Sequence, residues 1–220
     1  MKPGIRFFPT LIPLALLLLA PALRPTGATA DIGEIGNYNT DAFTTSEVHP
    51  RSGKIANSTP LISPVRVPDW TSGEYSFTAT DGYSIHARVL SKKHYALDRE
   101  SQLSPYDLAL GWQDMSDSDV IRRIDISQSD RWYHYHWSGA PPMAPDAMPL
   151  ESGNMHIIPA NDEVLRNLRK LAKGNVIFLE GYLVNVHASD GWLWKSATGS
   201  NSSGPHGCKV IWVTKIVIER

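Results

Sequence analysis

The chain has a single cysteine, Cys208, in 220 residues. One thiol excludes an internal disulfide, so the folded chain depends on packing for its stability. Cys208 opens an apolar run, which favours a small buried side chain. Two alternatives stay open for this residue, an intermolecular disulfide and a reactive nucleophile.

Runs of basic residues are also scarce. The chain holds 21 Lys and Arg against 22 Asp and Glu, a formal net charge of −1. The densest basic cluster, residues 166–173, falls on a predicted helix and is typical of a solvated helix face. Nucleic-acid-binding proteins usually carry a basic patch or stripe. Nucleic acid is therefore not expected as a partner.

Catalytic motifs are missing as well. The sequence has no Gly-x-Ser-x-Gly elbow, no phosphate-binding glycine loop, no dinucleotide fingerprint and no His-Glu-x-x-His zinc motif. His206 and Cys208 have the residue types of an activated thiolate, but their spacing defines no geometry. Asp98, Glu100 and Asp107 are interpreted as solvated loop charges. These observations favour a protein that is not an enzyme, and no cofactor is expected.

The N-terminus, in contrast, has the pattern of an export signal. Lys2 and Arg6 precede an apolar stretch over residues 7–23, and small residues end the segment at Ala30. The apolar stretch contains prolines and is shorter than the roughly 20 residues of a membrane span, which disfavours an uncleaved anchor. We expect cleavage of residues 1–30, which leaves a periplasmic or secreted chain without a membrane span. Three basic residues and no acidic one are removed, so the formal charge changes from −1 to −4.

Two regions follow the signal. Residues 31–72 are rich in Asn, Thr, Ser, Pro and Gly without a hydrophobic period, which predicts an extended or disordered N-terminal arm. Residues 73–220 are expected to form a single β-rich globular domain. At its start, two alternating runs flank Asp81 and Gly82, a pair typical of tight turns, and this pattern predicts a β-hairpin.

The rest of the domain shows further elements. A short helix capped by Ser116 or Ser118 is expected, and Asn161 is a good N-cap for an amphipathic helix that ends before Gly174. Four more strands are expected, at residues 131–137, 175–187, 192–196 and 208–218. The order predicts an α+β domain, a mostly antiparallel small β-barrel or sheet with one principal helix, and resembles that of an OB-fold. An open sheet packed on one helix would give the same pattern.

Aromatic and histidine residues alternate along residues 131–137. Because a strand directs alternate side chains to opposite faces, Trp132, His134 and His136 share one side. The simplest interpretation makes one face core and the other an exposed aromatic surface. We hypothesise that the exposed face binds a ligand, with Trp132 and His134 stacking on a planar or sugar-ring group. The candidate ligand-binding residues are Trp132, His134, His136, Trp192 and Trp194.

Trp192 and Trp194 share one face of a later strand. They either close the core or form an aromatic shelf on the surface. The sheet packing decides between these roles, and the sequence does not specify it.

Metal binding is an alternative use of the histidines. Two histidines at i and i+2 on a strand lie about 6.5 to 7 Å apart at Cα, from which both imidazoles reach one ion. His156 or His206 would supply a third ligand. The candidate metal set is His134, His136 and His156.

Four runs of the sequence carry a family resemblance: YSIHARVL at 83–90, LSPYDLALGW at 103–112, MSDS at 115–118 and NMHIIPAN at 154–161. They resemble a group of bacterial exported or membrane-anchored proteins to which no activity is assigned. The resemblance covers about residues 83–218. It implies a bacterial, periplasmic setting and transfers no catalytic residue.

These observations predict an exported non-catalytic module of the bacterial cell envelope that binds an unknown small ligand or an envelope protein. One alternative is a secreted metal-dependent hydrolase that uses the histidine cluster. Another is a structural or assembly factor of the envelope. Stoichiometric metal in the purified chain would favour the hydrolase, and a partner cross-linked in cells would favour the assembly factor.

Overall fold

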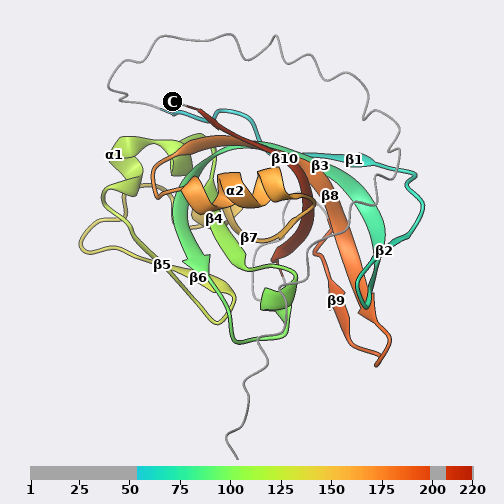
Figure 1. Ribbon diagram of the computed structural model, residues 1–220. Coiled ribbons are helices and arrows are strands. Elements are labelled where there is room, and N and C mark those ends of the chain that lie inside the picture. The colour runs from blue at the N-terminus through green and yellow to red at the C-terminus, as the bar shows by residue number, and fades with distance from the viewer. Residues whose placement is uncertain (1–53, 199–206, 220) are drawn as a thin grey trace, which may run out of the picture.

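The computed structural model describes residues 54–198 and 207–219, which form a mostly β structure with one principal helix (Figure 1). The strands are β1 (Leu61–Pro64), β2 (Trp70–Ser72), β3 (Tyr75–His94), β4 (Tyr106–Gly111), β5 (Asp125–Ser129), β6 (Trp132–His136), β7 (Ser152–Pro159), β8 (Val176–Ala188), β9 (Leu193–Lys195) and β10 (Lys209–Glu219). The helices are α1 (Ser118–Ile121) and α2 (Asp162–Lys170), with short 3-10 turns η2 (Glu100–Gln102), η3 (Gln113–Ser116) and η4 (Met148–Leu150). The predicted signal segment lies outside the described residues, as does the predicted arm up to residue 53.

Five strands form a partial ring. β3 pairs with β4, β4 with β7, β7 with β10, β10 with β8, and β8 pairs back with β3. All these pairings are antiparallel except that of β7 with β10, so the sheet is mixed. α2 lies between the third and fourth ring strands in the chain. This is the OB-like element order that the sequence predicts, in a ring that is not formally a closed barrel.

β3 differs from the predicted hairpin. It runs unbroken for 20 residues through Asp81 and Gly82, and its pairing with β8 shifts register between Ala79 and Asp81. β1 pairs with the same stretch from the other edge, where a Cβ on Gly82 would lie 2.9 Å from Oγ of Ser63. The hairpin prediction is therefore wrong. The Asp-Gly pair marks a register shift and a close approach of β1, because long-range partners on both edges keep the strand extended.

Helix α2 begins as predicted, with Asn161 as its N-cap. Oδ1 of Asn161 accepts a hydrogen bond from the backbone N–H of Val164 at 2.9 Å, as an N-cap does. Val164 and Leu168 are buried in the main core. The helix ends at Lys170, and Gly174, with φ of +93°, begins the turn into β8.

The short helix α1 is capped differently from the prediction. Its N-cap is Asp117, whose side chain accepts from the backbone N–H of Asp119 at 2.7 Å. Ser116 is buried instead, and its Oγ accepts from the backbone N–H of Ala56 at 2.9 Å. Ser116 therefore ties the start of the described chain to the domain.

β1 and β2 lie within the segment predicted as an extended arm, and both pair with β3. Trp70 of β2 stacks on Phe77 at 5.4 Å between ring centroids and contacts Trp212 edge-on at 5.4 Å. This segment covers part of the outer face of the sheet. In the described ranges, no helix is long and apolar enough to cross a membrane.

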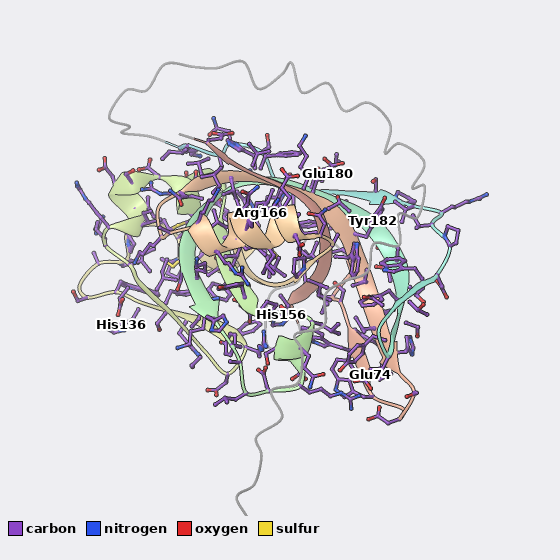
Figure 2. All side chains as sticks on the ribbon, viewed as in Figure 1. Glu74, His136, His156, Arg166, Glu180 and Tyr182 are labelled. Atoms are coloured by element: carbon purple, nitrogen blue, oxygen red, sulfur yellow. The ribbon has the colours of Figure 1, made fainter. Side chains whose placement is uncertain are left out.

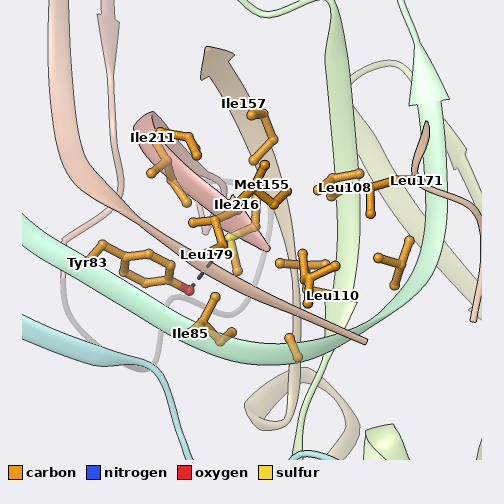
Figure 3. Packing of buried hydrophobic residues seen from close by; sticks show 14 of the residues in the cluster. Tyr83, Ile85, Leu108, Leu110, Met155, Ile157, Leu171, Leu179, Ile211 and Ile216 are labelled. Atoms are coloured by element: carbon orange, nitrogen blue, oxygen red, sulfur yellow. Dashed lines mark hydrogen bonds between the residues drawn. The ribbon is translucent and has the colours of Figure 1, made fainter. Parts of the chain in front are cut away.

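The interior of the ring is the main hydrophobic core (Figure 3). Leu108 of β4 and Met155 of β7 belong to this core. Because successive side chains on a strand alternate, the neighbouring Asp107 and His156 face outward from the ring. The outer face of β4 and β7 is thus the place where polar residues gather.

The hairpin β5–β6 lies off the ring, between β4 and β7 in the chain. Ile126 and Tyr133 bury one face of the hairpin against a separate apolar cluster that includes Ala109 of β4. The two turn residues, Asp130 and Arg131, both have positive φ, +50° and +62°. Such turns usually take Asn or Gly, so a specific contact must hold Arg131 there.

Candidate functional site

A cavity of about 560 Å³ opens where the β5–β6 turn meets β7 and β9. It is lined by residues 130–132, His156, residues 194–197 and Cys208. OB-folds bind ligands on the face of their second and third strands and on the loops that join strands 1–2 and 4–5. β4 and β7 occupy the second and third places here, and residues 189–208 connect the fourth strand to the fifth. The cavity therefore lies beside the third ring strand, β7, and the described ends of the connection between the fourth and fifth.

A buried carboxylate lies beneath the cavity. Asp107 is fully buried, and its Oδ1 accepts from Nη1 of Arg131 at 2.7 Å. Its Oδ2 lies 2.9 Å from Nδ1 of His156 and accepts from Nδ2 of Asn154 at 3.2 Å. The prediction that Asp107 is a solvated loop charge is wrong, because the residue belongs to β4 and is covered by the β5–β6 turn.

Arg131 joins this network to the β3–β4 loop. Its Nε and Nη2 donate to Asp98 at 2.7 Å each, and Nη1 also donates to the backbone oxygen of Ser104 at 2.9 Å. The guanidinium carbon lies 4.0 Å from the ring centroid of Tyr95. The hydrogen bond from Arg131 holds the pKa of Asp98 below its usual value. With these bonds and the one to Asp107, Arg131 acts as a clamp that holds the strained turn.

Two tryptophans of the β8–β9 region continue the cavity wall. The ring of Trp194 lies 5.0 Å from that of His156, with 43° between the planes. Trp192 lies 6.0 Å from Trp194, and the guanidinium of Arg99 lies 4.7 Å from its ring. Both tryptophans are half-buried and pack against the apolar cluster on the outer face of the sheet. They thus combine the two roles that the sequence left open, packing and an accessible aromatic surface.

Alternate side chains of the aromatic strand β6 differ in burial, as the strand alternation predicts. Tyr133 is buried, whereas His134 and His136 are exposed. Nε2 of His134 lies 3.2 Å from Oγ of Ser129 on the paired strand. Of the three residues predicted to share a ligand face, only Trp132 lines the cavity.

The candidate metal ligands are not brought together. His156 is buried on β7, and Figure 2 shows it well away from His136 at the outer hairpin. Across residues 54–198 and 207–219, no three His, Cys, Asp or Glu side chains are placed to hold a metal ion. His206, the other proposed third ligand, lies outside the described residues.

Cys208 reaches the cavity from the residue before β10. Its Sγ lies 3.6 Å from the backbone oxygen of Arg131 and 3.9 Å from Nδ2 of Asn154. Burial raises the pKa of the Cys208 thiol to about 12. The thiol is therefore protonated at neutral pH, which fits a packed small side chain better than a nucleophile.

We expect the Cys208 thiol to react slowly with a disulfide reagent such as dithionitrobenzoate in the folded chain. A pKa of about 12 instead of 9.0 reduces the thiolate population near neutral pH by at least about a hundredfold. The measurement is the rate of colour release, compared before and after unfolding in concentrated urea. Labelling of the folded chain as fast as that of the unfolded chain would contradict this prediction.

Sequence reasoning missed Asp107 and Arg131 because their partners are distant in the chain. Arg131 is 24 residues from Asp107, and His156 is 49 residues from it. No short sequence motif marks residues that are this far apart in the chain. The one signal in the sequence is Asp107 itself, a charged residue within the otherwise apolar run from Tyr106 to Leu110. Similarity gives no further guide to the role of the site: compared with protein-family models, curated proteins and solved structures, the chain matches none of them.

Proposed function

We propose that this protein is an exported, non-catalytic module of the bacterial cell envelope that binds a small ligand in the cavity between the β5–β6 turn, β7 and β9. The observation that carries the proposal is an aromatic-walled cavity above a buried, hydrogen-bonded polar network. Its volume of about 560 Å³ falls in the range of about 300–1,000 Å³ that is usual for small-molecule sites. Fold-level analogy adds the position of the cavity beside the third ring strand, β7.

The cavity is preorganised for binding. Arg131 fixes the turn that carries Trp132, and Asp107 fixes the ring of His156 opposite Trp194. Side chains that are already held in place lose little conformational entropy when a ligand arrives. This arrangement supports recognition of a ligand by shape and by hydrogen bonds.

The chemistry of the lining groups favours binding over catalysis. The thiol of Cys208 is protonated, and Arg131 uses four hydrogen bonds to protein acceptors. A non-catalytic binding module is the function that accounts for most of these features.

Equilibrium dialysis tests the proposal. The protein, purified from the periplasm, is dialysed against a muramidase digest of peptidoglycan and against sugars released from lipopolysaccharide, and retained compounds are identified by mass spectrometry. We expect at least one compound to be retained with unchanged mass. Trp132→Ala and Trp194→Ala should each reduce its retention by at least about tenfold, since aromatic anchors dominate binding energies.

His136→Ala is the matched control, because His136 lies on the same strand as Trp132 but is exposed away from the cavity. Its retention should equal that of the unaltered protein. Circular dichroism verifies that each variant is folded. Retention of no compound, or retention that both tryptophan substitutions leave unchanged, would overturn the proposal. A change in the mass of a retained compound would favour an enzyme instead.

A further inference from the structure

His156 lines the cavity and contacts the protein beneath it through one ring nitrogen. Nδ1 lies 2.9 Å from Oδ2 of Asp107, which also accepts from Asn154. A carboxylate beside a guanidinium is ionised and only accepts hydrogen bonds, so the hydrogen of a neutral His156 ring is on Nδ1. Nε2 is then left with its lone pair, as an acceptor.

His156 belongs to the wall of the cavity, where it is 4% exposed. Nε2 lies on the side of the ring opposite Nδ1, and the hydrogen bond to Asp107 is made through Nδ1. A ligand that supplies a hydrogen-bond donor satisfies an acceptor on Nε2, and a cavity that presents such an acceptor selects ligands with a donor.

The charges around the cavity disfavour an anionic ligand. Asp130, Arg131 and Lys195 line it, and Asp98 and Asp107 are bound to Arg131, which makes three acidic and two basic groups. The guanidinium of Arg131 is occupied by protein acceptors, so it is poorly placed to bind a phosphate. The oligonucleotide ligands of many OB-folds therefore fit poorly, whereas their uncharged oligosaccharide ligands remain compatible.

Trp194 supplies the complementary apolar surface. Its half-buried ring stands beside His156 at 5.0 Å between centroids. A sugar ring has a face of C–H groups that packs on an indole and a rim of hydroxyl groups that donate hydrogen bonds. A single sugar thus satisfies both Trp194 and the acceptor of His156.

We infer that the cavity binds an uncharged sugar, which stacks on Trp194 and donates a hydroxyl hydrogen bond to Nε2 of His156. This inference rests on the proposed function and names the ligand class of the same cavity. Asp107 is a positioning residue, because it fixes the tautomer of His156 without contacting the sugar.

The first test is the tautomer of His156 in the free protein, measured by long-range ¹H–¹⁵N NMR and assigned by the signal lost in His156→Gln. We expect a neutral ring with the hydrogen on Nδ1, at a pH where the ring is neutral. A neutral ring protonated on Nε2 would overturn the inference, whatever the protein binds.

The second test is a titration of tryptophan fluorescence with methyl glycosides of glucose, galactose and N-acetylglucosamine. Each is used as the free polyol and in permethylated form, which keeps the C–H faces of the ring but has no hydroxyl donor. We expect at least one free glycoside to bind, its permethylated form to bind at least about tenfold more weakly, and glucuronate to bind more weakly as well. Trp194→Leu should abolish the response, and His136→Ala should leave it unchanged.

Equal binding of the free and permethylated forms would overturn the inference, as would failure of every glycoside to bind. If no glycoside binds but the dialysis experiment still shows retention that depends on Trp194, the sugar inference fails and the proposed function stands. If dialysis also shows no such retention, both fail.

Discussion

Replacing Asp107 by alanine is expected to lower the free energy of unfolding by about 3–5 kcal/mol, because removing one partner of a buried ion pair leaves buried donors without their shared acceptor. The carboxylate of Asp107 is fully buried and accepts from Arg131, His156 and Asn154. Alanine leaves all three donors without this acceptor. Urea-induced unfolding, followed by tryptophan fluorescence, measures the loss.

Asp190→Ala is the matched control for Asp107→Ala. Asp190 also makes two hydrogen bonds to an arginine, Arg99, at 2.7 and 3.0 Å, but its carboxylate is exposed. Water solvates the arginine when this carboxylate is removed, so little change in stability is expected. Equal losses in the two variants would contradict the prediction for Asp107.

A double variant tests whether Asp107 and Arg131 stabilise the fold through their mutual contact. In Asp107→Ala combined with Arg131→Met, the guanidinium that faced Asp107 is removed together with the carboxylate, and Asp98 loses its ion-pair partner as well. The double variant should lose less stability than the sum of the two single variants, because the two residues are in direct contact. Additive losses would show that Asp107 and Arg131 stabilise the fold independently.

Local sequence signals identified the elements that local physics controls. The N-cap Asn161 specifies the start of α2, and the apolar, β-branched runs of β8 and β10 specify strands. The turn before β9 was also identifiable, since Gly191 there has φ of +88°. These features depend on residues within a few positions of one another.

The ring strands illustrate the limit of such signals. The predicted hairpin at Asp81 and Gly82 is one long strand, because β1 and β8 pair with it from both edges. The predicted strand at residues 131–137 is the off-ring β6, and β7 supplies the third ring strand instead. The predicted element order was therefore correct for the architecture, although it assigned different segments to the first three ring strands.

The candidate site was predictable only in part. Trp132 and Trp194 were identified from strand alternation, and both line the cavity. His134 and His136 were chosen by the same alternation, but the face that they share is exposed on the hairpin. Burial of Asp107 and the turn conformation of Arg131 arise from contacts between distant segments, which periodicity does not encode.

A second buried charge, Lys209, gives the other large expected effect. Lys209 is 3% exposed and pairs in register with the core residue Met155 at the start of β10. Burial lowers the pKa of Lys209 to about 8 from 10.5, although the charge of Asp81 opposes this shift. Between these two pH values the unfolded chain binds more protons at Lys209 than the folded chain does. The contribution of Lys209 to the free energy of unfolding therefore rises as the pH increases through this window.

Lys209→Met should stabilise the protein near pH 7 by at most about 3 kcal/mol, because methionine fills a similar volume without a buried charge. The gain should shrink between about pH 8 and 10.5, as the lysine of the unaltered protein becomes neutral in the folded and then in the unfolded state. Urea unfolding at a series of pH values measures this difference directly. Lys215→Met on the same strand is the control, and a gain is not expected there because Lys215 is exposed.

The comparison must be made between variants at each pH, because Cys208 acts in the opposite direction. Its pKa is raised from 9.0 to about 12, so the folded chain holds the thiol proton where the unfolded chain has lost it. The contribution of Cys208 to the free energy of unfolding thus falls as the pH rises above 9.0. Most of this fall is common to the unaltered protein and to Lys209→Met and cancels in their difference. The remainder comes from the charge of Lys209, which lowers the pKa of Cys208 and is absent from the variant. A difference that is constant across all pH values would show that Lys209 keeps its ordinary pKa in the folded protein.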